Sequence, residues 1–211
     1  MYRGVRLAAV TAACAVLGVS CSVAPDTGLR EAPELTSLLL TAAETGLEGA
    51  VAEPPVEAGE VATSLSTVML DVHTEGPCAE AIRAGLDTRI LPHASSSRLF
   101  NADSGSLEIG LFSTDTVVDA ERIYGDIVTH CDEPVRDDIH HVTYDVSPLK
   151  GPQPGMHVTA TGDDGRSFDI VILQAFTGRH GILAAGHHLS EDIVYEAFCA
   201  QMEKVRSATG L

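Results

Sequence analysis

The sequence predicts an α+β fold: a single domain in which helices flank an antiparallel β-sheet with a C-terminal meander. Two observations predict this class. Four β-favouring stretches follow one another in the C-terminal third, joined by short turn-forming connections. Amphipathic stretches complete the order helix, hairpin, helix, meander, helix. The 211 residues are enough for one domain with a proper core.

Residues 1–20 are typical of a signal peptide. Two arginines precede an apolar run that is shorter than the roughly 20 residues a spanning helix needs. The run ends in small residues followed by Cys21, as in bacterial lipoproteins, where the cysteine carries a diacylglycerol. We therefore expect Cys21 to anchor the protein at the outer face of the cell membrane. Gly18 stands where lipoproteins usually have Leu, Val or Ile, so ordinary cleavage before Cys21, giving a secreted protein, is one alternative, and an uncleaved anchor is the other.

Residues 21–34 are predicted to be a flexible tether, and residues 35–211 the folded domain. The tether is polar, contains prolines and has no apolar periodicity. Beyond it, Thr41 and Glu44 have the spacing of a capping box, in which each side chain satisfies a backbone amide of the other. This spacing predicts a short helix at residues 42–47.

The middle of the chain contains two predicted helices and a hairpin. Residues 65–73 favour a strand, and a short helix is expected at 78–86. The stretches 96–102 and 107–114 predict a β-hairpin, because the sequence DSGS between them is typical of a turn. Residues 117–131 carry apolar side chains at spacings of three and four, which predicts an amphipathic helix.

The meander and a final helix follow. The Asp164-Gly165 pair is a strong signal for a tight turn between two of the strands. Ser190 is placed to cap the last helix, in which the apolar residues again recur every three or four positions. The four strands are expected at residues 139–149, 156–162, 167–176 and 181–188.

Charge and the absence of known motifs restrict the function. The formal net charge of −17 repels nucleic acid phosphates and anionic lipid heads, so we expect no nucleic acid partner. The chain has no Gly-x-Ser-x-Gly elbow, no HExxH pair, no phosphate loop and no dinucleotide fingerprint. We therefore predict no catalytic residues, no resident metal and no cofactor.

The cysteines predict one disulfide. Thiols outside the cytoplasm tend to be oxidised. If Cys14 leaves with the signal peptide and Cys21 is acylated, Cys78, Cys131 and Cys199 remain. The first two lie at the ends of predicted helices, where bridging geometry is often available, so we favour the pair Cys78–Cys131. Cys199 is then a buried thiol on the last helix.

The nine histidines include two adjacent pairs, His140-His141 and His187-His188. These pairs lie on the first and last strands of the predicted meander. If those strands approached each other, the imidazoles could form a pH-sensing or metal-binding patch. Neighbouring residues of a strand point to opposite faces, so at most one histidine of each pair would face it. Surface histidines without a ligand are the alternative.

Four features resemble a known family. They are the opening LLLTAAE, a cysteine that follows Pro77 and starts a helix, the sequence DAERIYGDIVTHC that ends in a second cysteine, and the closing meander with its helix. Over residues 35–208, the chain resembles the extracellular sensor domain of the mycobacterial kinase PknH, which also occurs in mycobacterial lipoproteins. The resemblance implies the Cys78–Cys131 disulfide. A second family disulfide has no counterpart, because residues 139–188 contain no cysteine.

The resemblance implies a non-catalytic domain that binds an envelope ligand in a cleft. Together with the leader, it predicts a cell-envelope lipoprotein whose partner is a small molecule, a glycan, a lipid fragment or another protein. A lipid or glycolipid carrier, which needs a large apolar cavity, is one alternative. An envelope hydrolase, which needs a convergent nucleophile and base, is the other.

Overall fold

A computed structural model describes most of the folded region. The described residues are 28–58, 63–64, 74–87, 89–90, 92–114, 119–177 and 179–209. The predicted signal peptide, Cys21, most of the predicted tether and the predicted strand at 65–73 lie outside these ranges.

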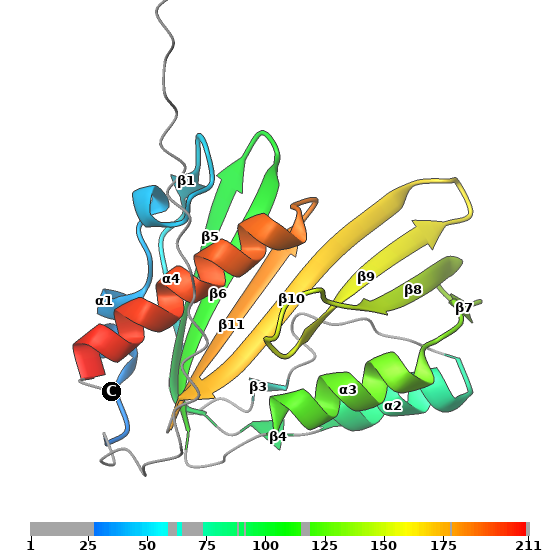
Figure 1. Cartoon of the computed structure of the whole chain (residues 1–211), viewed down its shortest axis with the longest axis horizontal. Coiled ribbons are helices and arrows are strands. Elements are labelled where there is room, and N and C mark those ends of the chain that lie inside the picture. The colour runs from blue at the N-terminus through cyan, green and yellow to red at the C-terminus, as the bar shows by residue number, and fades with distance from the viewer. Residues whose placement is uncertain are drawn as a thin grey trace, which may run out of the picture.

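The centre of the molecule is a nine-stranded antiparallel sheet in the order β1-β5-β6-β11-β10-β9-β8-β7, with β2 also paired to β5 (Figure 1). The predicted hairpin is β5–β6 and the predicted meander is β8–β9–β10–β11, so the α+β class is confirmed. A separate pair of short strands, β3 (Thr63–Ser64) and β4 (Arg89–Ile90), forms a second sheet. The main-sheet strands are β1 (Val51–Ala52), β2 (Val56–Ala58), β5 (Pro92–Ala102), β6 (Gly105–Thr114), β7 (Val135–Asp137), β8 (Val142–Pro148), β9 (Gly155–Gly162), β10 (Ser167–Thr177) and β11 (His180–His187).

The helices cover different halves of the sheet on opposite faces. Helices α1 (Ala32–Leu38) and α4 (Glu191–Thr209) share a core with β5, β6, β10 and β11. Helices α2 (Pro77–Asp87) and α3 (Ala120–His130) lie side by side and share a second core with β8, β9 and β10. Figure 1 shows α4 crossing one half of the sheet and the α2–α3 pair at the other.

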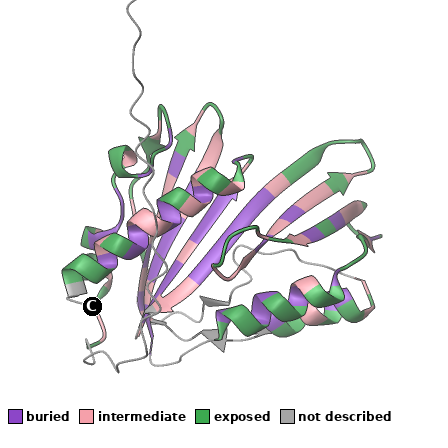
Figure 2. Cartoon of the chain, in the orientation of Figure 1, coloured by how far each residue is buried: buried purple, intermediate pink, exposed green. Residues whose placement is uncertain are grey.

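Strand β10 belongs to both cores, which explains its continuous apolar sequence. Ile170 and Ile172 pack toward α2 and α3, whereas Val171 and Leu173 pack toward α4. Because successive side chains of a strand point to opposite faces, a strand covered on both sides needs an unbroken apolar run. Figure 2 shows buried residues concentrated along this strand and on the sheet-facing sides of the helices.

Close contact between α4 and the sheet depends on a glycine. A Cβ atom at Gly186 of β11 would lie 2.2 Å from Cγ2 of Val194, which is fully buried on α4. Only glycine lets the helix approach the strand this closely. Val194 is one of the apolar residues that the helical periodicity places inward, with Phe198, Met202 and Val205, and all four are buried.

The N-terminal elements differ from the prediction. Helix α1 begins at Ala32, inside the stretch predicted as a tether, because Glu31 and Glu34 form a capping box there and Leu35 and Leu38 are buried. The helix predicted at 42–47 is a single 3₁₀ turn, η1 (Ala42–Glu44). The capping contact itself is present, since the backbone N–H of Thr41 donates to Oε2 of Glu44 at 2.7 Å.

Candidate functional site

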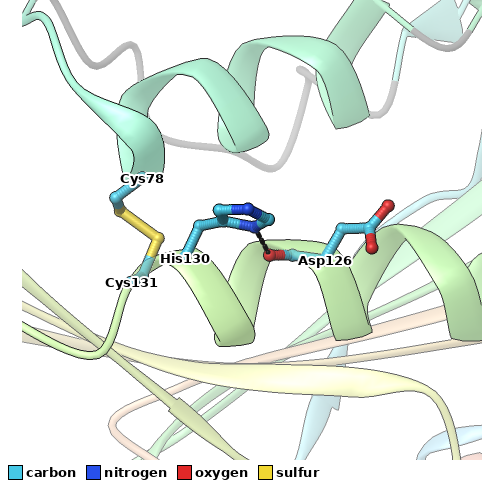
Figure 3. The surroundings of a disulfide bond; sticks show 4 residues. All are labelled: Cys78, Asp126, His130 and Cys131. Atoms are coloured by element: carbon cyan, nitrogen blue, oxygen red, sulfur yellow. Dashed lines mark hydrogen bonds between the residues drawn. A yellow bond between two sulfur atoms is a disulfide. The ribbon is translucent and has the colours of Figure 1, made fainter.

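Cys78 and Cys131 form a disulfide, the pair favoured from the sequence (Figure 3). It joins the first turn of α2 to the residue that follows α3, and both cysteines are buried. Closing a loop across 53 positions contributes about 4 kcal/mol in the chain-entropy description. Cys199 lies outside this pair and is half-buried on α4, less covered than expected. The bond therefore anchors the two helices that cover β8 and β9.

His140 and His141 belong to a turn, not to a strand as predicted. The fully buried carboxylate of Asp137 accepts hydrogen bonds from the backbone N–H groups of Ile139 and His140, and its Oδ2 lies 3.1 Å from Nδ1 of His140. His141 follows with a φ of 56°. These contacts shape the connection from β7 to β8, so β8 starts only at Val142.

His187 and His188 lie at the end of β11 beside an exposed phenylalanine. The ring of Phe168 is 5.1 Å from the ring of His187 and 5.7 Å from that of His188, measured between centroids. Burial lowers the pKa of His187, because it disfavours the charged imidazolium. His187 therefore favours its neutral form.

The structure does not bring the two histidine pairs together. Strands β9 and β10 separate β8 from β11. With neighbouring strands about 4.8 Å apart, β8 and β11 are about 14 Å apart. The first and last strands of the meander therefore do not approach each other, as a site shared by the two histidine pairs would require. Among the residues that the structure describes, no group of three or more His, Cys, Asp and Glu side chains is arranged to hold a metal ion.

A different histidine, His157 on β9, takes part in a polar cluster. Its Nε2 lies 2.5 Å from Oδ1 of Asp169 on β10, and its Nδ1 lies 3.7 Å from Oε1 of Glu191 at the start of α4. The hydroxyl of Thr159 donates to the same Asp169 oxygen at 3.1 Å. Alternation of apolar and polar residues along β9 indicates that His157 and Thr159 share a face. The sequence contains no sign that Glu191 meets them, because that contact depends on how α4 docks.

This cluster belongs to a polar stretch of sheet beside α4, which we call the polar sheet face. Strands β8 and β9 bury alternate residues under α2 and α3 and present the others on the opposite face. The register pairs Ser147 with His157, and Thr159 with both Asp145 and Asp169. The polar sheet face consists of Asp145, Ser147, His157, Thr159 and Asp169.

A pocket lies where this face meets α4, and we call it the α4 pocket. It has a volume of about 250 Å³ and is enclosed by β10, the first turns of α4 and the loop from β8 to β9. The loop is tied to the helix, since the backbone N–H of Lys150 donates to Oε2 of Glu191 at 3.3 Å. The pocket is lined by Leu149, Lys150, Gly151, Pro152, Val171, Leu173, Glu191, Asp192 and Tyr195.

Gly151 shapes one wall of the α4 pocket. A Cβ atom at this position would lie 3.2 Å from Cε2 of Tyr195, tighter than ordinary van der Waals contact. The absence of a side chain therefore lets the loop pack closely against the tyrosine ring.

A larger groove of about 620 Å³ runs between α2 and α3. Its walls combine small side chains such as Ala81, Ala84 and Gly85 with charged groups of both signs, Asp126 and Arg122. The α4 pocket differs because its floor belongs to the fully buried core and its charged side chains gather at one end of a helix.

The polar cluster engages both ring nitrogens of its histidine. Both ring nitrogens of His157 face carboxylates, so neither is directed at Ser147, its neighbour across the strands. A serine nucleophile needs a hydrogen-bonded base. The cluster therefore presents carboxylate and hydroxyl oxygens that can accept or donate hydrogen bonds, beside an apolar pocket floor.

Comparison with solved structures identifies the fold. The extracellular domain of PknH from Mycobacterium tuberculosis superposes with a TM-score of 0.54 at 13% identity, covering 85% of this chain and 98% of that one. A protein from Mycobacterium smegmatis, the Rv0999 ortholog, gives a TM-score of 0.45 at 11% identity over 86% and 98% of the two chains. No family model matches this chain, and no curated protein matches it. The resemblance to the PknH extracellular domain is confirmed at the level of fold.

Proposed function

We propose that this protein is a cell-envelope lipoprotein, anchored through Cys21, whose domain binds a small envelope ligand in the α4 pocket as a sensor-like module. The leader and its terminal cysteine support the anchor. The fold shared with the extracellular domain of a mycobacterial kinase supports placement outside the membrane. In the described part of the chain, no helix is both long and apolar enough to cross a membrane.

The observation that carries the proposal is the α4 pocket itself. Val171 and Leu173 form an apolar floor and are each only 1% exposed. Polar side chains of the loop and of α4, Lys150, Glu191 and Asp192, line the pocket beside this floor. An apolar floor with a few placed polar groups is the usual composition of a small-molecule site. Its volume, about 250 Å³, is slightly below the usual range of roughly 300–1,000 Å³, so it suits a small ligand.

The proposal assigns no reaction to the domain. Both ring nitrogens of His157 contact carboxylates, so this histidine is not placed as the base of a nucleophile. The combination of an apolar floor and a polar rim supports a binding role for the domain instead. We expect ligand binding to affect the position of α4, because Glu191 at its start contacts both the loop and the sheet.

Chemical-shift mapping tests this proposal. Fractions of an actinobacterial envelope extract are added to the isotope-labelled protein, and backbone amide shifts are recorded. Binding in the α4 pocket should perturb the amides of residues 149–151 and 191–195. Tyr195→Ala should weaken the effect, whereas Asp164→Asn, in the exposed turn between β9 and β10, should not. Perturbations confined to other surfaces would refute the assignment of this pocket.

A further inference from the structure

We infer that the α4 pocket recognises an organic cation, a compact ammonium group attached to a small apolar body. This inference rests on the proposed function, because it names the ligand class of the same pocket. It goes beyond that function by specifying the charge, which the apolar floor alone leaves open.

The pocket provides a place for the apolar part of such a ligand. Val171 and Leu173 on β10 form its floor, and Leu149 and Pro152 extend the apolar surface along the loop. A small hydrocarbon group placed there loses contact with water, and this favours binding.

The charged groups of the pocket favour a cation. Among its lining residues, Glu191 and Asp192 are acidic and Lys150 is basic. Glu191 also accepts a backbone hydrogen bond, whereas Asp192 is exposed at the rim. Carboxylates therefore outnumber cations around the pocket, and the formal net charge of −17 attracts cations and repels anions over a longer range.

The wall formed by Tyr195 favours a weakly hydrated cation over a metal ion. An ammonium group near the face of an aromatic ring is attracted by the ring quadrupole. Tyr195 is half-exposed and packs against Gly151 on one side. A quaternary ammonium loses little hydration on entering such a site, and its methyl groups match the apolar floor.

Choline and its neutral isostere 3,3-dimethylbutan-1-ol test the inference. Each is titrated into the full chain while the amide shifts of residues 149–151 and 191–195 are followed. We expect choline to saturate with a Kd in the millimolar range and the alcohol to bind at least tenfold more weakly. Raising the salt concentration should weaken choline binding and leave the alcohol unchanged, because only the first interaction is electrostatic.

Matched variants locate the interaction. Asp192→Asn should weaken choline binding at least threefold and Tyr195→Leu at least fivefold, with folding verified from the dispersion of the amide spectrum. The control Asp164→Asn also removes one negative charge, but in the distant turn after β9, so it should leave the Kd unchanged. If Asp164→Asn weakened choline binding as much as Asp192→Asn does, the overall charge of the protein, and not the pocket, would attract choline.

The outcomes separate the inference from the proposed function. Equal binding of choline and the alcohol at these amides overturns the cation inference while the pocket stands as a binding site. Amide shifts caused by an envelope compound, but by neither probe, would also overturn the cation inference and leave the pocket as a binding site. If neither the probes nor the extract perturb these amides, both the inference and the proposed function are refuted.

Discussion

Replacing the buried Gln201 with leucine should destabilise the protein more than any change at the surface of the same helix. Gln201 lies on α4 and is completely buried. Its Nε2 donates to the carbonyl of Leu38 at 2.8 Å, and its Oε1 accepts from the N–H of Leu40 at 3.0 Å. One side chain thus satisfies both backbone groups where the chain leaves α1, more than 160 positions away.

The expected loss follows from these two hydrogen bonds. Leucine has a similar size but no polar atoms, so Gln201→Leu leaves a buried N–H and a buried carbonyl without their partner. Each unsatisfied group costs about 1–3 kcal/mol, and the apolar gain of leucine offsets part of this. We expect the free energy of unfolding to fall by about 2–4 kcal/mol.

Urea denaturation followed by circular dichroism measures this difference. Glu196→Gln, a substitution on the exposed side of α4, is the matched control and should change the stability by less than about 0.5 kcal/mol. A loss below about 1 kcal/mol for Gln201→Leu would contradict the reasoning, because it would mean that the two backbone groups do not depend on the side chain.

Three further predictions concern the termini of the helices and the anchor. Reducing the Cys78–Cys131 disulfide should lower the free energy of unfolding by about 4 kcal/mol, measured in urea with and without dithiothreitol; equal midpoints would contradict the assigned role of the bond. A hydrogen bond from Lys204 lowers the pKa of Glu44 to about 2 from its ordinary 4.5, so this pair stabilises the protein above pH 4.5 and loses its effect as the pH falls toward 2. Lys204→Met should flatten that part of the pH–stability curve, and an unchanged slope would refute the assignment. Globomycin should cause the unprocessed precursor to accumulate if Cys21 is lipidated, and normal processing would show that it is not.

The meander was predictable because its signals are local. Turn-forming residues such as Asp164-Gly165 separate stretches of β-favouring residues, and each hairpin closes between neighbours in the sequence. Helix α4 was equally predictable from the sequence, because one continuous apolar stripe marks its buried side. The continuous apolar run of β10 follows from burial on both faces of the sheet.

Helix α1 was missed because its local signals are weak. The segment is short, contains Pro33 and carries only two buried leucines. Its position depends on Gln201, a polar residue whose role appears only when α4 has docked. Propensity and periodicity do not register a contact between segments so distant in the sequence.

The two histidine pairs lie apart for a topological reason. Consecutive strands of an open meander are neighbours, so its first and last strands are separated by the two between them. His140 and His187 could meet only if the sheet closed on itself. The α4 pocket was not predictable either, because it forms where the loop after Pro148 meets Tyr195 of a helix more than forty residues later.

Native mass spectrometry of the protein purified from an actinobacterial envelope tests the central claim most directly. The wild-type protein should carry a small ligand in stoichiometric amount, and the variant with both Asp192→Asn and Tyr195→Leu should lose it while keeping its fold. A ligand retained equally by both proteins would contradict the assignment of binding to the α4 pocket.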